Sequence, residues 1–420
     1  MTAYAHEPTW RTALSGAQIL FVAFGATVLV PLLTGLNPSL ALLGAGVGTL
    51  IFQLCTQRQV PIYLGSSFAF IAPVIYSVQT WGMPATLGAL AAASFFYYVA
   101  AGLVKWRGVD FIHRLLPPVV IGPVVMVIGL GLAQVAVNMA TGKAGEAQVV
   151  PYETAIAIAA ISLLATMLTA IRARGLLKLV PILVGVAVGY VASLFVGIVD
   201  FSKVTNAAWI AIPEFGKPEF NLAAILFMIP VAIAPIVEHV GGILAIGSVS
   251  GKDYTDSPGL HRTLLGDGLA VNVVGLFGGP PVTTYGEVTG AVMLTRNYNP
   301  AIMTWAAGFA ILMAFVGKFG ALLQTIPMPV MGGIMVLLFG SIAGIGLKTL
   351  MDAKVDLASP RNLCIVSVTL VTGIGPRRAY RQLLSAGHQP VRRAGRGAQF
   401  PAAETGGGAM SILAIFPGSP

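Results

Sequence analysis

Long runs of apolar residues, separated by short polar connections, fill the sequence from residue 16 to residue 374. A helix needs about 20 apolar residues to cross the hydrocarbon core of a bilayer, and most of these runs approach that length. They predict thirteen spans, at 16–35, 39–56, 61–79, 84–104, 117–138, 153–171, 176–198, 221–240, 263–279, 282–295, 300–319, 328–347 and 361–374. The pattern therefore predicts an α-helical, multi-pass membrane protein.

The third and tenth spans are poor helices. The third opens with Pro61, Gly65, Ser66 and Ser67, and residues 279–290 mix Gly and Pro with β-branched and aromatic residues. Each predicts a short extended piece followed by a half-helix. Because the two lie seven spans apart, they predict fourteen spans in two inverted repeats, and paired interruptions of this kind mark a transporter binding site. Half-helix N-termini would supply N–H groups and partial positive charge to that site.

Composition and charge agree with a membrane protein. The chain has 420 residues, 56% hydrophobic and 9% charged, with a mean hydropathy of +0.85, whereas soluble domains carry about 25% charged residues. A net charge of +9 would suggest binding to nucleic acid. If the N-terminus is cytoplasmic, however, fourteen Lys and Arg residues fall on the cytoplasmic side of the membrane and four in the outside loops. This bias indicates topology in the cell membrane and excludes a nucleic-acid partner. Cys55 and Cys364 lie in apolar runs, which excludes a disulfide framework or a Cys-rich metal site.

The tail does not fit the repeat. Residues 375–420 carry six Arg and one Glu and contain no fourteenth span. Read one base later, the codons for this stretch can encode an apolar segment. We hypothesise a frameshift near Gly375, which resequencing of the gene would contradict if the frame proved intact.

Two carboxylates, Glu238 and Glu287, lie at membrane depth, where an ionisable residue marks a functional site. The alternatives are that Glu238 reaches solvent at a helix end and that Glu287 caps a half-helix. A carboxylate accepts hydrogen bonds, so a pair suits a flat ligand with N–H groups, and a buried Glu can exchange a proton. His239, on another face than Glu238, is interpreted as structural, and Asp267 is expected to contact a neighbouring helix or backbone.

Several stretches match one known family in order from residue 18 to residue 373. They are 24–31, 61–70 (with Tyr-Leu-Gly-Ser-Ser-Phe-Ala-Phe), 208–209, 238–241, 258–262, 283–287, 327–333 and 354–356. On these residues the chain resembles the nucleobase–ascorbate, or nucleobase–cation symporter-2, family of uracil and xanthine permeases. The match covers nearly the whole chain and is specific for the family.

The resemblance implies a fourteen-span fold in which a core domain moves against a gate domain, with short strands in spans 3 and 10, and it implies a homodimer in the cell membrane. The implied divisions are a cytoplasmic N-terminus (1–15), the core (16–104 and 201–319), the gate (105–200 and 320–374) and the atypical tail (375–420). The implied activity is proton-coupled import of a nucleobase, with no cofactor besides the proton and no metal.

The resemblance also implies roles for single residues. Glu238 and Glu287 match the glutamates that hydrogen-bond the base. Glu238 also matches the position tied to proton coupling. Phe68 matches the aromatic residue that packs on the ring of the base. Tyr285 and Gly286 match positions whose backbone faces the ligand.

Two departures bear on the substrate. Gly242 replaces the usual His or Asp, and Val288 replaces a common Asn. Glu at 287 is similar to the pyrimidine members, so uracil is expected first and xanthine second.

The sequence gives less support to two other function classes. An intramembrane enzyme needs a nucleophile–base pair or a metal cluster at membrane depth, and the sequence offers neither. A channel or anion transporter of related architecture would favour cationic groups at the half-helix ends, where this chain has two carboxylates.

Overall fold

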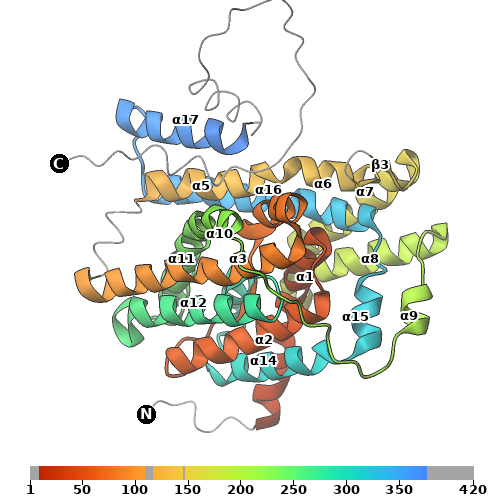
Figure 1. Cartoon of the computed structure of the whole chain (residues 1–420), viewed down its shortest axis with the longest axis horizontal. Helices are drawn as coiled ribbons and strands as arrows, with labels where there is room; N and C mark the ends of the chain where they lie inside the picture. The colour runs from red at the N-terminus through yellow and green to blue at the C-terminus, as the bar shows by residue number, and fades with distance from the viewer. Residues whose placement is uncertain (1–8, 109–116, 145–146, 376–420) are drawn as a thin grey trace, which may run out of the picture.

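The protein is described here by a computed structural model that covers residues 9–108, 117–144 and 147–375. The tail at 376–420, on which the frameshift hypothesis depends, lies outside these residues. The described chain consists mostly of helices that run side by side (Figure 1). The helices are α1 (Thr9–Thr34), α2 (Pro38–Cys55), α3 (Ile71–Arg107), α5 (Pro118–Gly131), α6 (Ala133–Ala140), α7 (Tyr152–Arg172), α8 (Pro181–Val196), α9 (Ser202–Asn206), α10 (Leu222–Met228), α11 (Ile233–Ser250), α12 (Leu260–Leu276), α13 (Gly286–Thr295), α14 (Ala301–Ala314), α15 (Gly317–Leu323), α16 (Met328–Asp352) and α17 (Pro360–Ile374). The short helical turns are η1 (Phe68–Phe70), η2 (Gly175–Leu179), η3 (Ile229–Ala232) and η4 (Thr255–Gly259), and the strands are β1 (Leu64–Ser66), β2 (Lys143–Ala144), β3 (Ala147–Gln148) and β4 (Val282–Thr284).

Seven helical segments of the described chain have the length and apolar character needed to cross a membrane. They are Thr9–Thr34, Pro38–Cys55, Phe68–Arg107, Pro118–Ala140, Tyr152–Arg172, Leu222–Ser250 and Met328–Asp352. The shorter α8, α14 and α17 are also apolar. The prediction of a helical, multi-pass membrane protein is confirmed.

The predicted boundary between the third and fourth spans is a bend within one helix and not a loop. The third and fourth predicted spans join in a single helix, α3, which breaks at Gly82. Gly82 has φ of 84°, a conformation that glycine adopts without a Cβ clash. Pro84 follows and lacks the N–H that a continuous helix would use. The chain therefore bends without a connecting loop.

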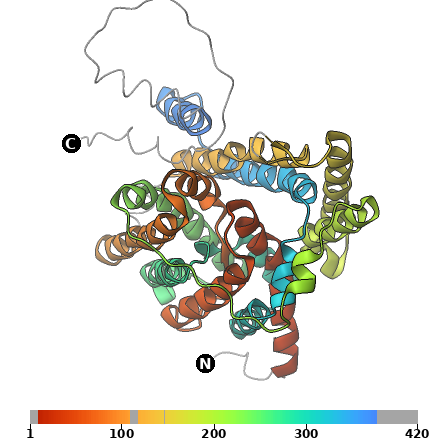
Figure 2. The same cartoon turned by 45° about the vertical axis from the view of Figure 1, so that its right-hand side comes forward.

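The helices pack in two groups, which can be followed in Figure 2. In the first group α3 packs on α10 and α12, α2 on α12 and α14, and α1 on α14. In the second group α16 packs on α5, α6 and α7, α7 packs on α8, and α17 packs on α5. The second group forms the top and right-hand edge in Figure 2. Contacts of α1 with α8 join the groups.

The two interrupted segments meet inside the first group. Strands β1 and β4 pair antiparallel, with Leu64 opposite Thr284 and Ser66 opposite Val282. The backbone N–H of Ser67 donates to the carbonyl of Pro281 at 2.8 Å, and that of Tyr285 donates to the carbonyl of Tyr63 at 3.1 Å. Each strand leads into a helix, β1 through η1 into α3 and β4 into α13. The prediction of two extended pieces followed by helices is confirmed.

Neighbouring helices complete the hydrogen bonding of β1. The N–H of Leu64 donates to the hydroxyl of Thr49 on α2 at 3.0 Å. The hydroxyl of Ser66 donates to the carbonyl of Thr27 on α1 at 2.8 Å. Extended backbone at membrane depth is tolerated only where protein satisfies its polar groups. These bonds therefore allow non-helical chain in the centre of the helix group.

Candidate functional site

The strand pair is closed by an aromatic side chain that crosses it. The hydroxyl of Tyr285, which directly follows β4, donates to the carbonyl of Ser66 at 2.8 Å. A Cβ on Gly65 would lie 2.4 Å from the Tyr285 ring, so only glycine fits beneath it. The Tyr285 side chain is 2% exposed and is thus fixed against β1.

Phe68 lies beside this ring. It is the first residue of η1, and its ring is parallel to that of Tyr285, with an interplanar angle of 4° and centroids 6.5 Å apart. Both side chains are buried. The structure therefore brings together two of the predicted site residues as parallel aromatic rings at the ends of the two strands.

Glu238 is carried by α11, which packs against both β4 and α13. Its side chain is half-buried. Residues four apart share one face of a helix, so Glu238 and Gly242 lie on the same side of α11. A Cβ on Gly242 would lie 2.9 Å from the hydroxyl of Thr284, which places that side of α11 against β4. Glu238 thus belongs to the face of α11 that meets the strand pair.

The start of α13 completes the arrangement. Gly286 is its first residue, and nothing lies within 4 Å of the position that a Cβ would occupy there. Tyr285 precedes the helix without capping it through a side-chain hydrogen bond, so the first N–H groups of α13 depend on other partners. Glu287 is the second residue of α13, but its side chain lies outside the described part of the structure.

The two buried ionisable residues near Glu238 form a pair. His239 and Asp267 are both fully buried, and His239 Nδ1 lies 3.1 Å from Asp267 Oδ2. The interpretation of His239 as structural and of Asp267 as a contact to a neighbouring helix agrees with this geometry. The sequence did not predict that each is the partner of the other.

Outside the spans, local hydrogen bonds hold the connection between α11 and α12, which the sequence predicts as a polar loop from Lys252 to Arg262. The hydroxyl of Thr255, followed by its backbone N–H, lowers the pKa of the exposed Asp253 carboxyl. Among the described residues, no three His, Cys, Asp or Glu side chains gather as metal ligands would. Asp253 in this connection therefore makes local hydrogen bonds to Thr255.

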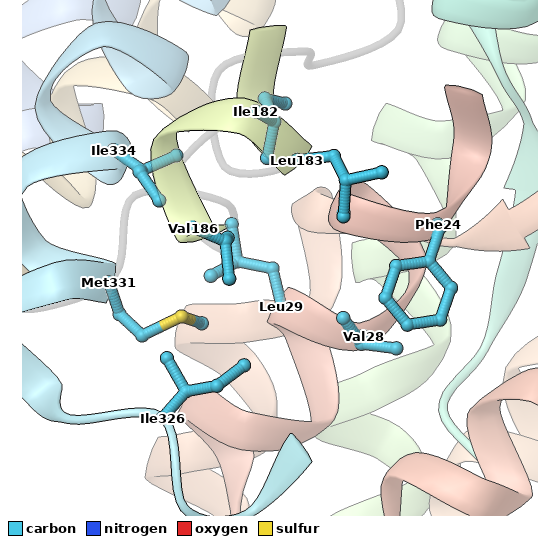
Figure 3. A pocket seen from close by; sticks show the side chains of 10 residues that line it. Phe24, Val28, Leu29, Ile182, Leu183, Val186, Ile326, Met331 and Ile334 are labelled. Atoms are coloured by element: carbon cyan, nitrogen blue, oxygen red, sulfur yellow. The ribbon is translucent and has the colours of Figure 1, made fainter. Parts of the chain in front are cut away.

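A small apolar cavity lies away from these residues (Figure 3). It lies between α1, α8 and the start of α16, and its lining residues are all apolar: Phe24, Gly25, Val28, Leu29, Ile182, Leu183, Val186, Ile326, Met331 and Ile334. Figure 3 shows these side chains converging from the two helix groups. A polar ligand needs hydrogen-bonding groups, so this cavity belongs to the seam between the groups rather than to the candidate site.

Comparisons with known proteins agree along most of the chain. The xanthine and uracil permease model, described as "Permease family", matches residues 11–380. The chain is 58% identical over 365 residues to the probable uracil permease of Haemophilus influenzae, covering 87% of each chain. It is 48% identical to the uracil permease of Bacillus caldolyticus, covering 85% of this chain and 84% of the relative. For the uracil permease of Escherichia coli K12 the identity is 41%, covering 87% and 85%.

Solved structures with the same fold are more distant in sequence. The transmembrane domain of the cyanobacterial bicarbonate transporter BicA aligns with a TM-score of 0.65 at 15% identity, covering 88% of this chain and 97% of that one. Murine Slc26a9, an anion transporter in an inward-facing state, aligns with a TM-score of 0.63 at 13% identity, covering 93% and 70%. At these identities the likeness concerns the fold alone.

Proposed function

The chain belongs to the xanthine and uracil permease family, and on that premise we propose that it imports uracil across the cytoplasmic membrane together with protons. Its relatives are permeases, so the protein is a transporter and not an enzyme. The observation that carries the proposal is the 58% identity to a probable uracil permease over 87% of both chains.

The candidate site suits this substrate chemically. Uracil is flat and has two N–H donors and two carbonyl acceptors on one ring. In the proposal, Glu238 and Glu287 accept the N–H groups, and Tyr285 and Gly286 offer their backbone. Phe68 supplies the aromatic surface on which the ring packs. The parallel rings of Phe68 and Tyr285 and the position of Glu238 on the face of α11 that meets β4 support these roles.

Proton coupling is assigned to Glu238. Its side chain is half-buried in the helical segment Leu222–Ser250, which is long and apolar enough to cross a membrane. A carboxylate in such a place is costly unless it is paired or protonated. In the proposal, protonation and uracil binding at Glu238 favour each other, so that one cannot cross without the other.

The transport step proposed is alternating access, in which a core (16–104 and 201–319) moves against a gate (105–200 and 320–374). The two packing groups of helices and the apolar seam between them support this division. The antiparallel pairing of β1 with β4 supports two inverted repeats of seven spans. A cytoplasmic N-terminus, a homodimer and a frameshift that replaces the fourteenth span remain part of the proposal.

Labelled-uracil uptake in cells that lack their own permease tests the proposal. We expect saturable uptake that an uncoupler abolishes and that excess unlabelled uracil competes more strongly than excess xanthine. A second version, with the tail restored by the one-base shift, tests the frameshift hypothesis and is expected to transport faster. Stronger competition by xanthine would assign the protein to purine transport, and absence of saturable uptake of either base by both versions would contradict the proposal.

A further inference from the structure

The buried pair formed by His239 on α11 and Asp267 on α12 has no part in the function proposed above. While Nδ1 of the imidazole faces Asp267, its other nitrogen, Nε2, lies 3.0 Å from the hydroxyl of Thr263. That hydroxyl donates its own proton to the carbonyl of Leu260 at 2.9 Å. Both ring nitrogens of His239 are therefore held by α12, on residues one turn apart.

This arrangement sets the number of protons in the pair. Because Thr263 donates to Leu260, its oxygen accepts from Nε2 of His239, and Nε2 carries a proton. A bare Nδ1 opposite a bare carboxylate would set two acceptors against each other at 3.1 Å. A proton on either Nδ1 or the Asp267 carboxyl removes this repulsion. Whichever atom holds it, the pair has no net charge, which is the condition for burying two such groups.

The pair is enclosed by elements that also build the candidate site. The ring of Phe52 on α2 meets His239 edge-on, with centroids 6.1 Å apart. Thr283 on β4 lies beside Asp267. Tyr97 on α3, whose side chain is fully buried, is within electrostatic reach of both Asp267 and Glu238. Phe52, Tyr97 and Thr283 thus face the pair from α2, α3 and β4.

The contact fixes the rotation of α11. Successive helix residues point about 100° apart, so a helix that turns His239 toward α12 turns Glu238 to another side. That side also carries Gly242, which meets Thr284 on β4. A small rotation of α11 would move the Glu238 carboxylate along the strand pair, and the pair with Asp267 opposes such a rotation.

We propose that His239 and Asp267 are positioning residues that hold Glu238 against the strand pair and so set its affinity for uracil and for the proton. This inference rests on the proposed function for its transport readouts. The pair acts through the geometry of α11 and does not touch the substrate.

The test is a double-mutant cycle with His239→Leu, Asp267→Ala and the combined variant. Each single change leaves an unpaired ionisable group in the interior, whereas the combined change leaves none. The matched control is Asn272→Ala, on the same helix α12. Asn272 donates at 3.1 Å to the carbonyl of Ala91 and at 3.1 Å to the hydroxyl of Ser94 on α3, away from α11. Thermal unfolding of the purified protein, the KM for uracil and the pH profile of uptake are measured for each.

We expect both single variants to unfold at lower temperature and the combined variant to recover at least half of that loss. We expect the combined variant nevertheless to keep a KM for uracil raised about tenfold or more and a shifted pH profile, since displacing a positioned group by about 1 Å can remove much of its effect. Asn272→Ala should lower stability while leaving KM and pH profile unchanged. A combined variant with wild-type KM and pH profile would reduce the pair to a structural role, and additive losses of stability would show that the two residues do not act together.

A readout without substrate separates this inference from the proposed function. Gly241 on α11 is exposed, with open space around it. In a background with Cys55→Ser and Cys364→Ser, maleimide labelling of the Gly241→Cys variant reports how accessible that side of α11 is to the reagent. We expect the combined variant to change the labelling rate several-fold and Asn272→Ala to leave it unchanged. If the wild type takes up no uracil, the proposed function fails, and an unchanged labelling rate in the combined variant overturns the inference independently.

Discussion

Gly65→Ala should disrupt the strand pair on which the candidate site is built. The new Cβ would lie 2.4 and 2.5 Å from two ring atoms of Tyr285 and 2.9 Å from the hydroxyl of Thr27. Ordinary contact begins near 3.4 Å, so the ring or the strand must move by about 1 Å. Neither moves freely, because β1 is paired with β4 and Tyr285 donates to Ser66.

The cost follows from these contacts. Overpacking by one methyl group in a close-packed interior costs about 1–3 kcal/mol. Loss of the Tyr285–Ser66 hydrogen bond adds about 1 kcal/mol. We therefore expect Gly65→Ala to destabilise the protein by about 2–4 kcal/mol and to lower the unfolding temperature by several degrees. Uracil uptake should fall as well, since Tyr285 and Phe68 shift together.

The assay is thermal unfolding of the purified protein in detergent, followed by initial rates of labelled-uracil uptake. Gly102→Ala is the matched control, because Gly102 lies in the exposed part of α3 with nothing within 4 Å of a Cβ. That change should stabilise the helix slightly, by up to about 1 kcal/mol. Combining Gly65→Ala with Tyr285→Ala removes the clash with the ring and should recover part of the lost stability. A Gly65→Ala protein with wild-type unfolding temperature and uptake would refute the reasoning.

Three further changes test other parts of the account. Glu238→Gln removes the titrating carboxyl and should abolish uracil accumulation while the protein still reaches the membrane, and proton-driven accumulation by this variant would exclude the coupling role. Tyr285→Phe removes one hydrogen bond, 2.8 Å long, and should cost about 1 kcal/mol of stability, read as a small fall in unfolding temperature, with no fall expected if the bond is unimportant. Gly242→Ala places a methyl group 2.9 Å from the hydroxyl of Thr284 and should raise the KM for uracil. An unchanged KM would show that this face of α11 does not form part of the uracil site.

The sequence predicts the strands but not their contacts. Glycine and proline in the third and tenth spans indicate extended chain, because they weaken helices locally. The register of Leu64 with Thr284 depends on how the two halves of the chain meet, which no local pattern records. That Gly65 must lack a side chain because Tyr285 covers it is likewise a property of the assembled pair.

The ionisable residues show the same limit. A charge in an apolar run predicts a buried polar group, which is how Glu238, His239 and Asp267 are found. The pairing of His239 with Asp267 is not predictable from the sequence, because the loop before α12 sets which face of that helix meets α11. Likewise, the break at Gly82 is visible as glycine near proline, but its positive φ, and hence a bend without a loop, appears only in the structure.

The central claim is proton-coupled uracil transport, and its most direct test uses the purified protein in liposomes with an imposed pH gradient and no membrane potential. We predict that labelled uracil accumulates above its external concentration when the compartment from which it enters is acidic, and that the Glu238→Gln variant only equilibrates it. Accumulation that ignores the pH gradient, or failure to transport uracil in either direction, would contradict the account.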